Sequence, residues 1–198
     1  MLNSVTAEFA GQLQHILPAA AFPDLSDKYL MEPRGRYHGS AGLLVAPENT
    51  EQVSQIMQTA EQARVAVLPY GGGTGLVGGQ VLTSVAGGPP APLILSLERM
   101  RRIRACYPEE NVLVVEAGAV LAEVQAAAAQ VNRLFPLSLA SEGTAQIGGL
   151  LATNAGGVNV LRYGMARDQV LGIEAVMADG QIFNGLKRLR KDNTGYDL

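Results

Sequence analysis

The sequence predicts a fold that mixes helices and strands, on three observations. Apolar residues recur at helical spacing in three stretches, and short apolar runs typical of buried strands lie between them. Clusters of glycine separate many of these segments. The chain has 198 residues, of which 47% are hydrophobic, so it can bury a sizeable core as one domain or as two small lobes.

The first half predicts a helix, then a strand–helix–strand unit. Apolar residues at helical spacing indicate a helix that runs to about Leu17, where Pro18 ends it. Gly42–Ala46 is typical of a short buried strand, Thr50–Ala63 has the apolar stripe of a helix, and Val65–Leu68 is a second strand. This order predicts a βαβ unit.

The second half predicts strands joined by tight turns, with one long helix among them. The strands are expected at Leu93–Leu97, Ile103–Tyr107, Val112–Glu116, Val170–Met177 and Gln181–Phe183. Gly87–Pro92 and Pro108–Asn111 are expected to be turns, and Asp179–Gly180 is a hairpin signal. The alanine-rich segment Leu121–Val131 predicts the helix, and Gln146–Thr153 is a short apolar segment flanked by glycines.

Composition excludes several classes of function. The formal net charge is -3 and no basic stripe occurs, which argues against nucleic acid as a partner. No apolar stretch approaches the ~20 residues of a membrane span, and Met1–Ala10 lacks the pattern of a signal peptide. The single cysteine, Cys106, rules out an internal disulfide framework and leads us to expect a cytoplasmic protein.

No residues in the sequence are spaced as metal ligands or as a proton-transfer cluster, so neither a metal site nor a catalytic residue is assigned. The histidines, His15 and His38, are interpreted as surface or packing residues. The chemistry of the chain must therefore be sought in its glycine-rich segments.

The first glycine segment, Pro69–Gly79, must be compared with two nucleotide-binding motifs. Gly73, Gly75 and Gly78 match G-x-G-x-x-G in spacing, but the dinucleotide motif needs a helix that starts within it. Gln80–Ser84, with more glycine and proline soon after, is poor helix material. A phosphate-binding P-loop is excluded as well, because no Gly-Lys-Ser/Thr follows.

A glycine run without a helix can still bind an anion. Consecutive backbone N–H groups can form a nest around phosphate oxygens, and Thr74 could add a hydroxyl donor. The alternative is a tight loop between strands with no ligand. Each glycine costs about 0.5–1 kcal/mol relative to alanine, and this cost is easier to understand if a ligand offsets it.

A second segment, Ser141–Gly157, consists mostly of small residues. It also carries hydroxyl and amide groups at Ser141, Thr144, Thr153 and Asn154, which suit a flat ring system that forms hydrogen bonds. Close helix packing through small residues explains this segment alone about equally well. Two such segments in one chain make the purely structural explanation much weaker.

These two segments, with Arg162–Gly164 and Lys191–Leu198, resemble the FAD-linked oxidases of the vanillyl-alcohol-oxidase type, which have a PCMH-type FAD-binding domain. Within that group the chain is most similar to the FAD-dependent D-2-hydroxy-acid dehydrogenases, such as D-lactate dehydrogenase, the glycolate oxidase subunit and D-2-hydroxyglutarate dehydrogenase. The resemblance runs from about Arg34 to the last residue, and it rests on two long motifs in the right order.

The resemblance implies an α+β FAD-binding domain of two lobes, residues 1–99 and 100–198, with FAD extended between them. The residues expected to hold the pyrophosphate are Gly71, Gly72, Gly73, Thr74 and Gly75, with Gly78 shaping the exit. The residues expected near the ribityl chain and pyrophosphate are Pro136, Ser141, Gly143, Thr144, Gly148 and Gly149, and those expected on the flavin side are Ala152, Thr153, Asn154 and Gly157. Neither segment contains His or Cys, so FAD is expected to be non-covalent.

The resemblance also implies a larger enzyme. Family members continue past Leu198 into a strand that completes the FAD site and then a substrate domain, so we expect a truncated FAD-binding domain whose 2-hydroxy acid would bind through the absent part. The expected reaction is oxidation to a 2-oxo acid by hydride transfer to FAD.

Two alternatives stay open: a non-catalytic FAD-binding or assembly fragment, and a flavin reductase of the cell-wall-precursor type. Thr153–Gly157 followed by Arg162–Gly164 favours the hydroxy-acid group by resemblance. The sequence also leaves open whether the chain forms a homodimer.

Overall fold

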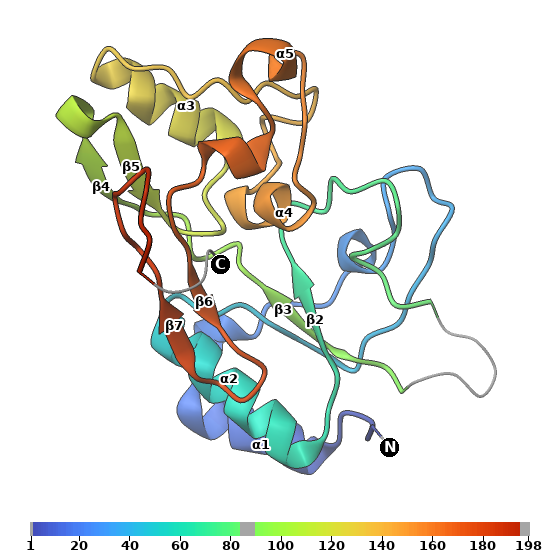
Figure 1. Ribbon diagram of the computed structural model, residues 1–198. Coiled ribbons are helices and arrows are strands. Elements are labelled where there is room, and N and C mark those ends of the chain that lie inside the picture. The colour runs from blue at the N-terminus through green and yellow to red at the C-terminus, as the bar shows by residue number, and fades with distance from the viewer. Residues whose placement is uncertain (1, 84–89, 195–198) are drawn as a thin grey trace.

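The computed structural model describes residues 2–83 and 90–194 (Figure 1). The turn expected at Gly87–Pro92 therefore lies partly outside the described residues. Residues 195–198, the end of the segment Lys191–Leu198 that resembles the family, lie wholly outside them. In Figure 1 a parallel sheet with the helices α1 (Ala7–Ile16) and α2 (Thr50–Ala63) forms the lower part of the molecule. The helices α3 (Leu121–Gln130), α4 (Ile147–Ala152) and α5 (Val160–Tyr163) lie in the upper part.

The lower part is a parallel sheet in the order β1-β3-β2, formed by β1 (Leu43–Val45), β2 (Val67–Tyr70) and β3 (Leu93–Ser96). The βαβ order and the parallel direction are as predicted, but β3 lies between the other two strands. All four residues of β3 are buried, which is typical of a strand covered on both faces. β2 starts two residues later than predicted because its partners in β3 begin opposite Val67.

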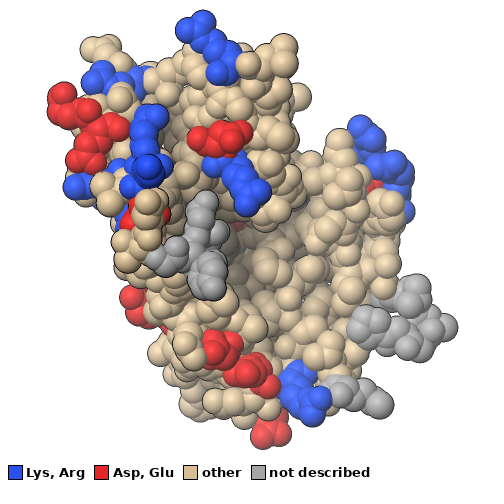
Figure 2. Space-filling view, viewed as in Figure 1, with Lys and Arg blue, Asp and Glu red and all other residues tan. Residues whose placement is uncertain are grey.

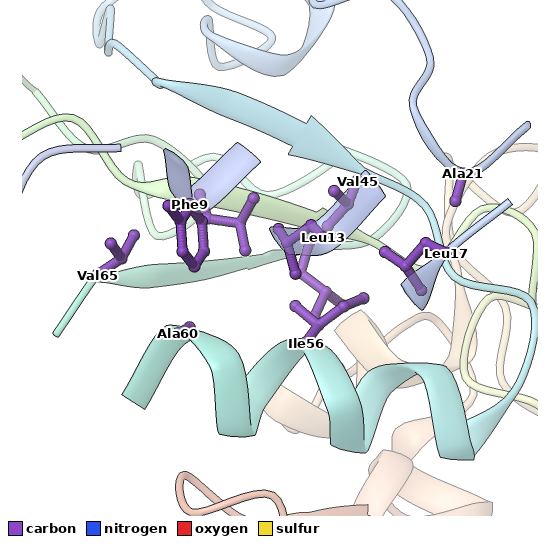
Figure 3. Close-up of a cluster of buried hydrophobic side chains, with 10 residues drawn as sticks. Phe9, Leu13, Leu17, Ala21, Val45, Ile56, Ala60 and Val65 are labelled. Carbon is purple, nitrogen blue, oxygen red and sulfur yellow. The ribbon is translucent and has the colours of Figure 1, made fainter. Parts of the chain in front are cut away.

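Helices α1 (Ala7–Ile16) and α2 (Thr50–Ala63) cover one face of this sheet. Each begins where a polar side chain caps it: Thr6 accepts from the Phe9 N–H at 3.1 Å, and Asn49 accepts from the Gln52 N–H at 2.8 Å. Their apolar sides meet the sheet in one core, shown in Figure 3, that includes Phe9, Leu13, Leu17, Val45, Ile56, Ala60, Leu93 and Leu95.

The upper part begins with the antiparallel pair β4 (Ile103–Tyr107) and β5 (Val112–Val115), as predicted. Helices α3 (Leu121–Gln130), α4 (Ile147–Ala152) and α5 (Val160–Tyr163) follow. Single-turn 3₁₀ helices occur at Ala19–Ala21, Asp27–Tyr29, Pro108–Glu110 and Ala166–Gln169. A second core forms around Leu121, Val124, Leu137, Ala145, Ile147 and Leu150.

No helix within residues 2–83 and 90–194 is both long enough and apolar enough to span a bilayer.

The last hairpin, β6 (Glu174–Val176) and β7 (Ile182–Asn184), returns to the lower part and lies against α2. The Ser54 hydroxyl donates to the Gly180 carbonyl at 2.6 Å. The strand predicted at Val170–Met177 is shorter in the structure because β7 pairs only with residues 174–176. Residues more than 120 positions apart are therefore neighbours at this contact.

A charge network joins the two parts beside this hairpin. The Glu116 side chain is buried and accepts from the backbone N–H and the Nε–H of Arg102, at 2.8 and 2.9 Å. Arg104 lies 3.4 Å from Glu116 and donates to Glu174 on β6 at 2.8 Å, and Glu174 accepts from the Thr50 hydroxyl on α2 at 2.7 Å. Burial alone would raise the pKa of Glu116, but hydrogen bonds and charge from Arg102, with Arg104 adding to them, outweigh it and lower the pKa below 4.5.

The lowered pKa predicts an acid-sensitive fold. Because the folded state favours the ionised Glu116, this group stabilises the fold above pH ~4.5 and loses its contribution as pH falls through the lower folded pKa. We expect Glu116→Gln to lower the Tm by several degrees at pH 7 and to have a progressively smaller effect as the pH falls below about 4.5, as measured by circular dichroism. Glu109→Gln, at an exposed position, is the control. An equal Tm loss at pH 7 and below about pH 4.5 would contradict the assignment.

Candidate functional site

The first glycine segment follows β2 at the carboxyl end of the parallel sheet, where open sheets commonly bind ligands. Gly73 and Gly78 have φ values of 68° and 78°, in the left-handed region that favours glycine. The Gln80 amide donates to the Gly75 carbonyl at 2.7 Å, and this bond keeps the turn closed. No helix forms between Gly71 and Thr83, so the dinucleotide-binding motif is excluded by structure as well as by sequence.

The two glycine segments meet at Gly72. A Cβ atom on Gly72 would lie 2.1 Å from the Thr144 carbonyl oxygen and 3.2 Å from the Cα atom of Ala145. A Cβ atom on Gly71 would lie 3.8 Å from the backbone nitrogen of Gly149. The absence of a side chain at Gly72 thus lets two segments about 70 residues apart lie backbone to backbone.

The start of the second segment is a tight turn before α4. The backbone N–H of Thr144 donates to the Ser141 carbonyl at 3.0 Å, and this turn presents the Thr144 carbonyl to Gly72. Gly143 and Gly149 have open space where a Cβ would stand, whereas a Cβ on Gly148 would lie 2.9 Å from the Cβ of Ala117. Gly143 and Gly149 are thus open to a ligand, while Gly148 serves the packing of α4.

The other residues expected at the site form a second group around the end of α4. Gly157 has φ 145° and lies against the Ser138 carbonyl, and Asn159 donates to the Pro136 carbonyl at 2.9 Å. The Thr153 hydroxyl donates to the Gly149 carbonyl at 3.0 Å. Asn154 is also engaged, since its side-chain oxygen accepts from the Arg167 N–H at 3.0 Å. Ala152 is the last residue of α4.

A cavity of about 410 Å³ lies against the first glycine segment. Its lining includes Lys28, Glu32, Tyr70, Gly71, Gly72, Gly73, Glu98 and Gln146. Figure 2 shows the surface hollowed between the upper and lower parts of the molecule, with walls formed mostly by residues other than Lys, Arg, Asp and Glu. A larger cavity of about 670 Å³ lies between α2, β4, β5 and β6; of the glycines expected to bind the cofactor, only Gly148 lines it.

The polar residues that line the smaller cavity were missed by sequence reasoning. The Tyr29 hydroxyl donates to the carboxylate of Glu98 at 2.9 Å, and the Tyr70 hydroxyl donates to the Lys28 carbonyl at 2.6 Å. Burial raises the pKa of Tyr70, so this hydroxyl keeps its proton. Tyr70 lies within the first glycine segment, but no periodicity or spacing signal linked Lys28, Tyr29 and Glu98 to that segment, because only the fold brings them together.

Glu32 is a buried carboxylate beside the same cavity. It accepts from the backbone N–H groups of Arg34 and Arg36, at 2.9 and 2.6 Å. Burial opposes ionisation, but these two bonds and the nearby arginine charges outweigh it and lower the pKa of Glu32. The Arg36 guanidinium in turn donates to the Leu76 carbonyl at 2.9 Å, so this turn holds the far end of the first glycine segment.

Within the part of the chain that the structure describes, Gln146 is the one residue of the second segment that lines this cavity. It is 8% exposed, and its Oε1 atom is buried with no hydrogen-bond partner among the described residues. Its place between Ala145 and Ile147 in a glycine-rich segment was the only signal in the sequence. The described residues contain no group of three or more His, Cys, Asp or Glu side chains that could hold a metal ion.

Comparison with known proteins gives a consistent result. A family model described as "FAD binding domain" matches residues 41–185. D-2-hydroxyglutarate dehydrogenase, mitochondrial, from Danio rerio is 39% identical over 198 residues, which are 99% of this chain and 36% of that protein. The protein of the same name from Arabidopsis thaliana is 42% identical over 163 residues, which are 82% of this chain and 28% of that protein.

Solved structures show the same fold. An alkyldihydroxyacetonephosphate synthase matches with a TM-score of 0.80 at 20% identity, over 98% of this chain and 36% of that one. Phl p 4, a grass pollen allergen with glucose dehydrogenase activity, matches with a TM-score of 0.73 at 19% identity, over 88% of this chain and 37% of that one. The predicted α+β fold of the PCMH-type FAD-binding domain is confirmed.

Two further facts come from these relatives. The chain spans about a third of their length. The prediction of a cytoplasmic protein is wrong, because the similar relatives are named as mitochondrial dehydrogenases. The prediction relied on the single cysteine, and low cysteine usage argues only against oxidising compartments without separating the reducing ones from each other.

Proposed function

Because the chain belongs to the FAD binding domain family, we propose that it holds the FAD of a flavoprotein that oxidises a D-2-hydroxy acid to a 2-oxo acid. The observation that carries the proposal is the contact of Gly72 with Thr144, which joins the two glycine segments beside a cavity. The names of the relatives support D-2-hydroxyglutarate as the substrate class. D-lactate and glycolate are further candidates from the sequence resemblance.

The residues at this junction fit FAD. A pyrophosphate group offers only acceptors, so it needs closely spaced donors. Around Gly72 and Gly73 the φ angle changes sign, a geometry in which successive N–H groups converge on an anion. Gly143 and Gly149 leave open space across the junction.

We therefore assign the pyrophosphate to Gly71–Gly75, with Thr74 as an added hydroxyl donor and Gly78 as the turn that closes the segment. Residues Pro136, Ser141, Gly143, Thr144 and Gly149 are assigned to the region of the ribityl chain and pyrophosphate, while Gly148 lets α4 pack against Ala117 behind them. Ala152, Thr153, Asn154 and Gly157 are assigned to the flavin side. The lobes 1–99 and 100–198 and a homodimer are further parts of the proposal. Light scattering of the purified chain tests the homodimer.

The chain's own residues bind and orient the cofactor. Bound FAD supplies the acceptor for the hydride that leaves the α-carbon of the hydroxy acid. The backbone N–H groups of the first glycine segment would hold the pyrophosphate, and the second segment would form the other side of the junction. We assign the substrate contacts and the group that takes the hydroxyl proton to the part of the relatives' length that this chain does not span.

FAD binding by the 198-residue chain tests this proposal directly. We expect one FAD per chain when flavin-free protein is titrated, seen as quenched flavin fluorescence. Acid precipitation should release all of the FAD, because the proposed cofactor is non-covalent. A colourless protein that takes up no FAD would contradict the proposal and favour an assembly fragment.

The substrate class needs a protein that spans the full length of the relatives. We expect its flavin to be bleached by D-2-hydroxyglutarate or D-lactate under anaerobic conditions and not by the L enantiomers. Bleaching by NADPH alone would favour the reductase alternative. The 198-residue chain with bound FAD is expected to show no turnover of either D acid.

A further inference from the structure

Gln146 has an unmet hydrogen bond at the junction of the two glycine segments. Its Oε1 atom is sealed from solvent and has no donor within hydrogen-bond distance among the described residues. Other glutamine amides near the site are engaged: Gln80 donates to Gly75 at 2.7 Å, and Gln125 donates to Leu137 at 2.8 Å. A buried polar atom without a partner destabilises the fold, so its presence in a native chain needs an explanation.

The backbone of Gln146 is held on both sides, which limits what its side chain can reach. Its carbonyl accepts from the Leu150 N–H at 3.1 Å as α4 begins, and the residue forms a bridge with Val120. Its Oε1 atom lies 3.6 Å from the position that a Cβ on Gly71 would take, and the residue lines the 410 Å³ cavity. The amide at the end of the side chain can turn, because rotation about that last bond is soft.

We propose that Gln146 binds FAD directly, with Oε1 accepting a hydrogen bond from a hydroxyl group that flanks the pyrophosphate. This inference rests on the proposed function, in which FAD lies between the two glycine segments. The pyrophosphate has no donor to offer Oε1. The nearest donors along FAD on either side of the pyrophosphate are hydroxyls, from the ribityl chain or from the ribose. On binding, the amide turns from Gly71 toward the cavity.

The test is Gln146→Met, which keeps the shape of the side chain and removes its polar atoms. We expect FAD to bind about 5- to 10-fold more weakly, because one ligand hydrogen bond is lost. We also expect the Tm of the flavin-free chain to rise by about 2–4 °C, because an unpaired buried oxygen is removed. If Gln146 had a purely structural role, Gln146→Met would lower the Tm of the flavin-free chain.

Gln125→Met is the matched control. It removes the bonds to the Leu137 carbonyl at 2.8 Å and to the Glu142 carboxylate at 3.5 Å, and neither residue is assigned to FAD, so it should lower the Tm and leave the FAD affinity unchanged. If the unsubstituted chain binds FAD and Gln146→Met binds it equally well, the inference about Gln146 fails while the proposed function stands. If the unsubstituted chain binds no FAD, the proposed function fails and the role of Gln146 fails with it.

Fragments of the cofactor identify the hydroxyl. ADP carries the ribose and FMN carries the ribityl chain, and calorimetry can measure both with the unsubstituted chain and with Gln146→Met. A loss of affinity for FMN alone assigns the ribityl hydroxyl, and a loss for ADP alone assigns the ribose hydroxyl. An equal loss for both would indicate a general disturbance of the pyrophosphate segment and would overturn the proposal.

Discussion

Replacement of Gly72 by alanine is expected to weaken FAD binding by about 100-fold. The new Cβ would lie 2.1 Å from the Thr144 carbonyl oxygen and 3.0 Å from its carbon, so one of the two backbones must move. Overpacking of this kind costs about 1–3 kcal/mol. The flavin-free chain can relieve the clash by letting the two segments move apart, whereas the proposed FAD site needs them together, so a cost near 3 kcal/mol falls on the bound state and corresponds to about 100-fold in affinity. Fluorescence titration with FAD measures the loss.

Gly79→Ala is the control for this substitution. It lies in the same segment, and a Cβ there would meet no atom within 4 Å. We expect its FAD affinity to stay within about 2-fold of the unsubstituted chain, because nothing in the junction must move. Full FAD affinity in Gly72→Ala would show that FAD binding does not need the close contact of Gly72 with Thr144. The proposed function would then lose the observation on which it rests.

Replacement of Gly157 by alanine is expected to lower the free energy of unfolding by about 3 kcal/mol. Its φ of 145° is rarely adopted by residues with a side chain, and a Cβ would lie 2.3 Å from the Ser138 carbonyl oxygen. That oxygen accepts from the Val158 N–H at 3.1 Å, so the same shift would strain this bond. Thermal unfolding should show a Tm lower by about 6–12 °C.

The neighbouring glycine provides a matched control. A Cβ on Gly156 would lie 3.6 Å from Val160 Cγ1, which is an ordinary contact. Gly156→Ala is therefore expected to be neutral or to stabilise the chain by up to about 1 kcal/mol, because alanine restricts the unfolded chain. Equal losses at Gly156 and Gly157 would mean that loss of glycine in general, and not the conformation of Gly157, destabilises the segment.

Local signals in the sequence predicted most elements of the fold. The helix expected at Thr50–Ala63 has those bounds in the structure. Its N-cap residue, Asn49, and the apolar stripe that follows are both local signals in the sequence. The residues after the glycine run Gly71–Gly75 are poor helix material, so the sequence excluded a dinucleotide-binding helix before the fold was known. Family resemblance added the cofactor, and the family comparison supports it.

Long-range contacts were beyond the reach of the sequence alone. The residues around Leu93–Ser96 carry no signal that this strand lies between β1 and β2. The residues around Glu174–Val176 likewise carry no signal that β6 packs against α2. Those positions depend on the summed burial of segments far apart in the chain.

The candidate site divides in the same way. The residues that could let a phosphate approach the backbone are visible in the sequence, because the lack of a side chain is a property of glycine in any fold. Folding brings Gly72 against Thr144 and Gly148 against Ala117, and it buries the Gln146 Oε1 atom with no hydrogen-bond partner among the described residues. Whether a polar atom is paired depends on every neighbour within hydrogen-bond distance, and folding brings those neighbours from distant parts of the chain.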